Sequence, residues 1–185
     1  MTDELLMRAV QGGDLDSLGE LFERHHRQVF HFLSRTTGDS AVAEDLVQEV
    51  FVRILKYRHT YDASRRFETW VFRLARNVRA DHFRKRGPAV EAMDDEMDMP
   101  TADAGPAQQL EQQMNAQQLE RALQRMADEP RDLLVLARCH GMPYDQIADT
   151  LGIEVGAVKV RVHRALKQLR AVFFTLEGAP CAAKK

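Results

Sequence analysis

Basic side chains gather near the C-terminus of this 185-residue chain, at a spacing that suits contact with phosphates and base edges. Between Glu154 and Arg170 there are five Lys/Arg and one acid. On a helical wheel, the apolar residues of this segment form one stripe that must pack against another element. The stripe consists of Val155, Val158, Val162, Leu166, Leu169 and Phe173. The other faces carry Lys159, Arg161, His163, Arg164 and Lys167.

The residues just before this basic helix predict how it is held. Tyr144, Ile147, Ala148 and Leu151 form a short amphipathic helix, and Gly152 follows in a tight turn. A helix, a turn with glycine and a second helix with exposed cations make a helix-turn-helix pattern. In that motif the second helix enters the major groove, where arginine can pair bidentately with guanine. The alternative, a solvated basic surface helix, does not explain the preceding turn.

A second basic segment runs from Arg65 to Arg86, with eight Lys/Arg against two acids. Its predicted buried stripe is Phe67, Trp70, Val71, Leu74 and Val78. The opposite side carries Arg66, Arg73, Arg76, Arg79 and Arg84, with Phe72 and Phe83 interleaved. Cations beside aromatic rings suit single-stranded nucleic acid, whose unpaired bases stack on the rings. As an alternative, both phenylalanines belong to the core.

The segment AVAEDLVQEVFVRIL predicts a helix with an acidic ridge. Asp45, Gln48, Glu49 and Val52 lie on the exposed side, while Leu46, Val50 and Ile54 face inward. The ridge can dock a basic protein partner or be an ordinary solvated surface. A third hypothesis makes Glu44, Asp45 and Glu49 the metal site of a hydrolase. It lacks a second carboxylate cluster and a glycine-rich phosphate loop.

Histidine and cysteine side chains can bind metal ions, but the spacing of these residues in the sequence disfavours a metal site. Cys139 and His140 are adjacent, so they point apart on a helix, and no zinc-ligand spacing such as Cys-x-x-Cys occurs. We therefore expect no metal and no cofactor. Two cysteines suit a reducing cytoplasm. No apolar run reaches the roughly 18 residues that a membrane span requires, so no stable membrane insertion is expected.

Three- and four-residue apolar steps throughout predict an all-α protein. Asp14 and Ser40 are the expected N-caps of two helices, and a helix break is expected near Pro130. Gly87 to Glu120 holds eight acids and no Lys or Arg. The predicted organisation is a helical domain (1–86), a flexible acidic linker (87–112), a second helical domain (113–176) and a disordered tail (177–185).

Three segments, in this order, resemble the extracytoplasmic-function (ECF) sigma factors of the sigma-70 family. AEDLVQEVFVRIL resembles the region that binds core RNA polymerase. RFETWVFRLARNVRADHFRK resembles the regions that melt and read the −10 promoter element. YDQIADTLGIEVGAVKVRVHRALKQLR resembles the region that reads the −35 element. The resemblance implies a transcription initiation factor with no covalent chemistry of its own, held by an anti-sigma factor until a stress signal arrives.

The resemblance also implies roles for individual residues. Asp45, Gln48 and Glu49 would bind core polymerase. The −10 DNA would be bound by Arg66, Arg73, Arg76, Asn77 and Arg84, with the loop from Tyr61 to Arg66 framing a flipped base. The −35 DNA would be bound by Lys159, Val160, Arg161, His163, Arg164 and Lys167. The family often has serine and threonine at the start of the recognition helix; Ala157 offers no hydroxyl there, and Val160 is placed to touch a thymine methyl.

A conventional helix-turn-helix regulator with an N-terminal helical sensing domain is the alternative. It explains Tyr144 to Arg170 but not the basic, aromatic segment from Arg65 to Arg86. The two hypotheses differ in binding, because such a regulator binds duplex DNA alone whereas a sigma factor needs core polymerase.

Overall fold

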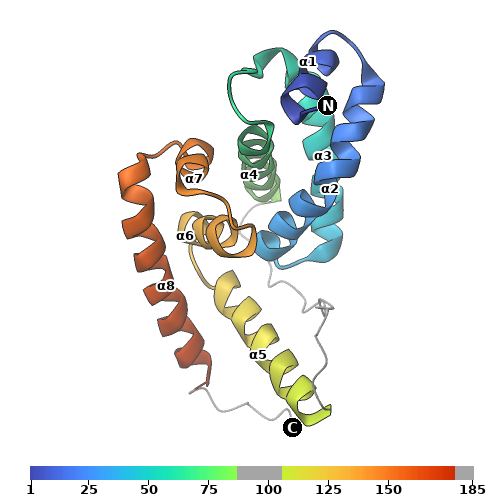
Figure 1. Ribbon diagram of the computed structural model, residues 1–185. Helices are drawn as coiled ribbons and strands as arrows, with labels where there is room; N and C mark the ends of the chain where they lie inside the picture. The colour runs from blue at the N-terminus through green and yellow to red at the C-terminus, as the bar shows by residue number, and fades with distance from the viewer. Residues whose placement is uncertain (87–105, 178–185) are drawn as a thin grey trace.

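The computed structural model of the protein describes residues 1–86 and 106–177, and within these ranges it contains helices and no strand. The prediction of an all-α fold is confirmed. The helices are α1 (Asp3–Gln11), α2 (Leu15–Thr37), α3 (Ser40–Tyr57), α4 (Phe67–Arg86), α5 (Pro106–Gln124), α6 (Asp128–Leu134), α7 (Tyr144–Leu151) and α8 (Val155–Glu177) (Figure 1). A 3-10 turn, Arg58–Thr60, follows α3, and a π-helical turn, Val135–Cys139, follows α6.

The predicted linker and tail overlap the ends of two helices. Residues 87–105 and 178–185 lie outside the described residues. α5 begins at Pro106, so residues 106–112, the last part of the predicted linker, are helical. Proline suits the first helical position because that N–H has no acceptor within the helix. Likewise α8 continues to Glu177, the first residue of the predicted tail.

Capping residues fix where the long N-terminal helices begin. The Asp14 carboxylate accepts hydrogen bonds from the backbone N–H groups of Asp16 (3.0 Å) and Ser17 (3.4 Å), as expected of an N-cap. The expected cap at Ser40 is wrong. The Asp39 carboxylate accepts the bond from Val42 N at 2.9 Å, and Ser40 is already the first residue of α3. A carboxylate one residue upstream takes the position that the serine hydroxyl was expected to fill.

The predicted break near Pro130 lies slightly earlier. α5 ends at Gln124 and α6 begins at Asp128, so Pro130 is the third residue of α6. In the first turn of a helix a missing N–H costs no hydrogen bond, which explains why the proline is tolerated there.

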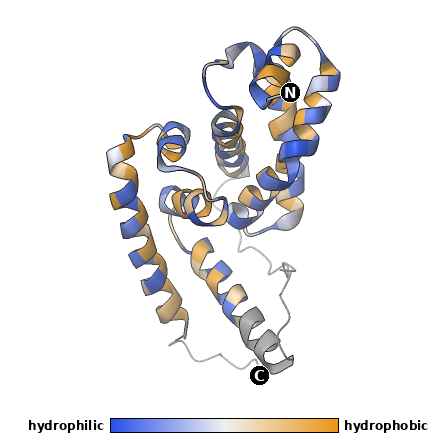
Figure 2. Cartoon of the chain, in the orientation of Figure 1, coloured by the Kyte–Doolittle hydropathy of each residue, from blue (hydrophilic) through white to orange (hydrophobic). Residues whose placement is uncertain are grey.

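The first four helices form a bundle in which α2 packs against α1 and α3, and α4 packs against α3. Leu21, Phe32, Ile54 and Phe67 are fully buried in its core. α1 begins after the N-cap Thr2 and buries Leu6, Met7 and Val10, which recur at three- and four-residue steps. Figure 2 shows hydrophilic and hydrophobic residues alternating along the helices, the pattern of amphipathic helices that bury one side.

In the second group, α6 and α7 both pack against α8, and α5 runs beside the C-terminal part of α8. Gly152, with φ of +67°, ends α7 in the left-handed conformation and allows the tight turn into α8. Val158, Val162 and Ala165 form the buried side of α8. Val155 does not belong to that side, contrary to prediction, because it stands at the start of the helix and is 52% exposed.

The two groups of helices pack against each other. α7 lies against α4, and α5 and the π-helical turn lie against α2. His140 contacts the Phe32 ring of α2 and the Phe72 ring of α4, with ring centroids 6.3 and 5.0 Å away. A single apolar cluster therefore runs from α1 to α8. α8 lies on the outer side of the C-terminal group, away from α1–α4 (Figure 1).

Candidate nucleic-acid and polymerase interfaces

The predicted acidic ridge is exposed on α3. Asp45, Gln48 and Glu49 all face solvent, while Leu46, Val50 and Ile54 are buried as expected. Glu49 accepts a 2.8 Å hydrogen bond from Arg53, which also reaches Asp81 on α4 at 2.6 Å. These contacts fix the position of the ridge relative to α4.

An apolar groove borders the ridge. It has a volume of about 330 Å³ and lies between α2 and α3. Its lining residues are Leu15, Leu18, Gly19, Phe22, Gln48, Phe51, Val52 and Leu55. Gln48 belongs both to the ridge and to the groove. Charged and apolar groups are thus adjacent on one accessible surface, a combination typical of protein-docking sites.

The five residues predicted to bind −10 DNA fall into two sets. Arg66, Asn77 and Arg84 are exposed, and Arg84 pairs with Asp81 at 2.6 Å. Arg73 and Arg76 are only half-exposed, because helices of the C-terminal group cover them. The structure therefore brings all five to α4 and the loop before it, but leaves three of them open to solvent.

The covering contacts centre on Asp132 of α6. Its carboxylate accepts a hydrogen bond from Arg76 Nε at 2.8 Å and two from the guanidinium of Arg79, one of them at 3.2 Å. Asp132 is 1% exposed and Arg79 3% exposed. Arg73 and Arg76 also donate to backbone carbonyls at the end of α7, those of Asp149 and Thr150 (3.3 Å for the latter). We call Arg73, Arg76 and Arg79 the arginine face of α4.

Residue spacing alone does not reveal this arrangement. Arg79 lies among the predicted basic residues, yet it is buried against a residue more than fifty positions away. A local signal does exist in α6, where Asp132 directly precedes the buried residues Leu133, Leu134 and Val135. An acid in such a run needs a basic partner, because burying a lone carboxylate is costly.

The aromatic residues of α4 do not form a stacking surface. Phe72 is fully buried, with its ring edge-on to Phe32 at a centroid distance of 5.4 Å. Phe83 is half-buried and contacts the His82 ring. The stacking interpretation of Phe72 is wrong, and the core alternative is confirmed for Phe72 but not for Phe83, which lies outside the buried core. Trp70 and Leu74, predicted to be buried, are only half-buried.

The loop before α4 is held firmly at one residue. Tyr61 is buried beside Phe67 and Trp70, and its hydroxyl donates to the Arg65 carbonyl at 2.7 Å. Burial, with the nearby Glu4 carboxylate, raises the pKa of Tyr61 to about 12. The Gln11 amide donates to the carbonyl of Tyr61 at 2.9 Å. The Tyr61 ring is therefore part of the core.

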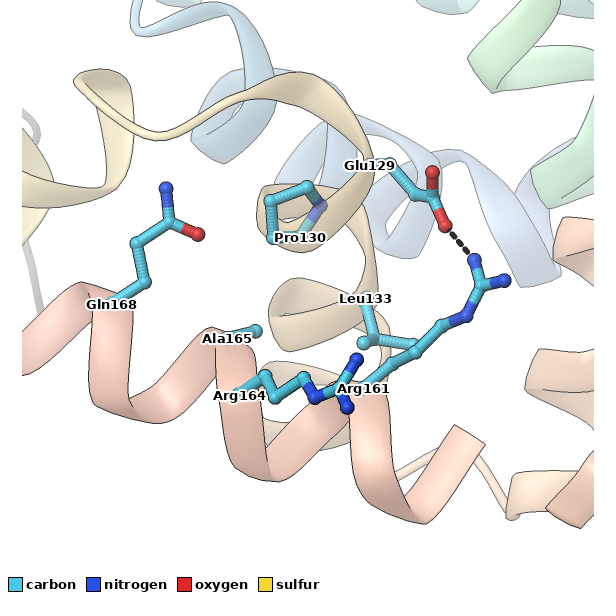
Figure 3. A pocket seen from close by; sticks show the side chains of 7 residues that line it. All are labelled: Glu129, Pro130, Leu133, Arg161, Arg164, Ala165 and Gln168. Atoms are coloured by element: carbon cyan, nitrogen blue, oxygen red, sulfur yellow. Dashed lines mark hydrogen bonds and ion pairs between the residues drawn. The ribbon is translucent and has the colours of Figure 1, made fainter. Parts of the chain in front are cut away.

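The predicted −35 residues lie on the outer side of the molecule. Lys159, Val160, His163, Arg164 and Lys167 are exposed on α8. Arg161 bends toward α6 and pairs with Glu129 (Figure 3). Together with Arg164 these two residues border a shallow cleft of about 240 Å³ between α6 and α8. No helix of the N-terminal group covers this basic face (Figure 1).

Metal-ligand clusters and membrane-spanning helices are both absent from the described residues. No group of three or more His, Cys, Asp or Glu is placed to hold a metal ion in residues 1–86 and 106–177. In the same ranges no helix is long and apolar enough to cross a membrane. Cys139 is exposed, but desolvation by its neighbours raises the pKa of the thiol, which disfavours the reactive thiolate.

Comparison with known proteins identifies the class. Residues 21–88 match the family described as Sigma-70 region 2, and residues 116–169 match Sigma-70, region 4. The chain is 30% identical over 171 residues to the RNA polymerase sigma factor CarQ of Myxococcus xanthus, which covers 92% of this chain and 97% of CarQ. It is 34% identical over 158 residues to the ECF RNA polymerase sigma factor SigE of Mycolicibacterium smegmatis, covering 84% of this chain and 61% of SigE.

A solved structure of CnrH in complex with the cytosolic domain of CnrY has the same fold, with a TM-score of 0.68. The two sequences are 25% identical, and the match covers 94% of this chain and 97% of the other. The protein belongs to the ECF RNA polymerase sigma factors of the sigma-70 family, which act in transcription initiation. The match to Sigma-70 region 2 excludes the alternative of a conventional regulator with a sensing domain.

Proposed function

We propose that three surfaces of this sigma factor divide the work of initiation. The α3 ridge of Asp45, Gln48 and Glu49, with its apolar groove, binds core RNA polymerase. α4 binds and helps to melt the −10 element through Arg66, Arg73, Arg76, Asn77 and Arg84. α8 reads the −35 duplex through Lys159, Val160, Arg161, His163, Arg164 and Lys167. The protein itself catalyses no reaction and works in the cytoplasm with the polymerase.

The observation that carries this proposal is the outward basic face of α8. Its apolar residues pack on α6 and α7, and Lys159, Arg164 and Lys167 remain exposed after a helix-turn-helix turn at Gly152. A helix with one side anchored and the other side basic can enter the major groove without rearranging its support. Val160 is 50% exposed on the same helix, which supports the proposed apolar contact with a thymine methyl.

We also propose that a protein partner of the anti-sigma type holds the factor inactive. CnrH, which shares the fold, is described in complex with the cytosolic domain of CnrY. The apolar groove between α2 and α3 supports such binding, because apolar surface bordered by charge suits a partner helix.

In vitro transcription with purified core polymerase and a promoter library tests the proposal. On the promoter that is selected, Arg164→Ala should weaken −35 binding by about 1–3 kcal/mol if the arginine contacts a base. Arg170→Ala is the matched control, because Arg170 is exposed nearer the C-terminal end of the same helix. If Arg164→Ala transcribes from the selected promoter as well as Arg170→Ala and the parent protein do, α8 does not read the −35 element through Arg164.

The other two surfaces have their own variants. Glu49→Lys should weaken binding to core polymerase, whereas Glu23→Lys, at another exposed position on α2, should not. Asn77→Ala should slow promoter opening more than it weakens the closed complex, because a captured base contributes only after strands separate. Equal core affinity of the two lysine variants refutes the α3 assignment.

A further inference from the structure

The side chain of Gln11, the last residue of α1, holds the backbone at the start of the loop before α4. Its amide nitrogen donates hydrogen bonds to the carbonyls of Arg58 and Tyr61, each at 2.9 Å. We propose that Gln11 is a positioning residue for −10 recognition: it fixes the loop of residues 61–66 and thereby sets how well that loop discriminates between bases. This inference rests on the proposed −10 role of α4 and of the loop that precedes it.

The two Gln11 bonds join α1 to a part of the backbone that is distant in sequence. The acceptor carbonyls belong to residues 47 and 50 positions further along the chain. The N–H of Tyr61 also donates to the Arg58 carbonyl, at 3.3 Å, and closes the 3-10 turn there. A side-chain amide has two N–H donors, and here both acceptors are backbone carbonyls. Removing these donors therefore loosens the start of the loop and leaves the turn and the helices in place.

The other end of α1 contacts the other end of the loop. The Glu4 carboxylate accepts a hydrogen bond at 3.4 Å from the N–H of Phe67, the first residue of α4. The first N–H groups of a helix have no acceptor within it, so an outside carboxylate satisfies one of them. Glu4 and Gln11 lie about two helical turns apart and therefore on the same side of α1. One side of a single helix thus supports the loop at both ends.

α1 is itself held in place, as such a support must be. Its apolar side is buried in the core of the bundle. The Asp3 carboxylate is hydrogen-bonded to Arg24 and to His25 of α2, each at 2.7 Å. When the Gln11 donors are removed, α1 should therefore stay where it is, and the loop should be the part that moves.

Hydrogen bonds within the loop fix its shape and leave its polar groups on the surface. The Tyr61 hydroxyl donates to the Arg65 carbonyl at 2.7 Å. The Asp62 carboxylate accepts from the N–H and the hydroxyl of Ser64, at 2.9 and 2.8 Å. Asp62, Ser64 and Arg65 are exposed, as is Arg66 at the end of the loop. The loop is thus a preformed polar surface, and its position relative to α4 depends on α1.

Base discrimination depends more strongly on the position of this loop than overall affinity does. Cations attract phosphates through long-range charge, which carries no sequence information. Hydrogen bonds to a base edge instead require a donor–acceptor distance of about 3 Å and a restricted angle. A loosened loop loses such contacts, while the arginines of α4 can still bind the strand. Loss of the Gln11 donors should therefore lower specificity much more than it lowers affinity for any single strand.

The test measures base preference in the holoenzyme, assembled from the full chain and core polymerase. Fluorescence anisotropy gives dissociation constants for labelled single-stranded oligonucleotides. These are the non-template −10 sequence of the selected promoter, its single-base variants and a scrambled sequence. Gln11→Met keeps the length of the side chain and removes both N–H donors. At the position that the parent discriminates best, we expect the preference to fall about tenfold, while affinity for the scrambled sequence stays that of the parent.

A control and a second variant make the result decisive. Gln28→Met makes the same change at an exposed position of α2 and should alter neither quantity. Glu4→Ala removes the acceptor at the other end of the loop and should also lower the preference. Unchanged preference in folded Gln11→Met overturns the inference, as does an equal loss of affinity for every oligonucleotide. If circular dichroism shows that Gln11→Met is misfolded, unchanged preference in Glu4→Ala overturns it instead.

Failure of the proposed function has a different signature. If the parent holoenzyme shows no base preference on these oligonucleotides, the −10 role of α4 and its loop is wrong, and positioning by Gln11 fails with it. If the parent discriminates and Asn77→Ala is defective, but Gln11→Met discriminates like the parent, the −10 role stands and positioning by Gln11 is refuted.

Discussion

Replacing Phe72 with alanine measures how much one buried ring contributes to the free energy of unfolding. The side chain is fully buried, edge-on to Phe32 within the bundle and to His140 across the interface. Phe→Ala substitutions in a core cost about 3–5 kcal/mol, because apolar contact is lost and a cavity remains. We expect a loss in this range for Phe72→Ala, since close neighbours on two elements limit how far the site can collapse.

Urea unfolding followed by far-ultraviolet circular dichroism gives the change in the free energy of unfolding. Phe174→Ala is the matched control, because the same atoms are removed from a residue that is 64% exposed, and its effect should stay within about 0.5 kcal/mol. Had Phe72 been a surface ring for stacking on bases, its substitution would behave like the control. A loss below about 1 kcal/mol for Phe72→Ala contradicts its place in the core.

Two further predictions concern protonation and capping. Burial lowers the pKa of His140 from 6.5 to about 4, so the folded protein favours the neutral ring. The free energy of unfolding therefore keeps its full value above pH 6.5 and decreases as the pH falls from 6.5 toward 4, because the unfolded chain binds a proton first. The urea midpoint of the parent should therefore fall more steeply over that range than that of His140→Gln, and parallel curves would contradict this. Asp39→Ala should cost about 1 kcal/mol of stability in the same assay and Ser40→Ala much less, because Asp39 caps α3; equal losses would refute this assignment.

The sequence correctly predicts which residues are buried and which are exposed where this depends on a single amphipathic helix. On α3, the three-and-four spacing places Leu46, Val50 and Ile54 in the core and Asp45 and Glu49 in solvent, and the structure agrees. The same holds for the central part of α8. Periodicity succeeds there because an amphipathic helix buries its apolar side, whichever element packs against it.

The periodicity of a single helix does not reveal which groups of other helices cover its basic surface. From the pattern alone, Phe72 and Arg79 both lie among the exposed arginines of α4, yet both are buried. An arginine is equally satisfied by a DNA phosphate or a protein carboxylate, and spacing within α4 cannot tell these acceptors apart. The deciding residue, Asp132, belongs to another helix and meets α4 only once the chain has folded. Contacts between distant elements are thus the part that sequence periodicity leaves open.

The two groups of helices pack together in this structure, a closed arrangement that bears on the order in which the proposed surfaces can be used. The α3 ridge at Asp45 and Glu49 and the basic face of α8 are exposed in the closed chain, while Arg79 is buried. Core polymerase can therefore engage α3 before the halves separate, but DNA cannot reach the full arginine face of α4 until they do. Breaking the buried pair of Asp132 and Arg79 leaves both charges in need of water or new partners. On the proposed roles, separating the two halves therefore costs free energy until other groups bind these charges.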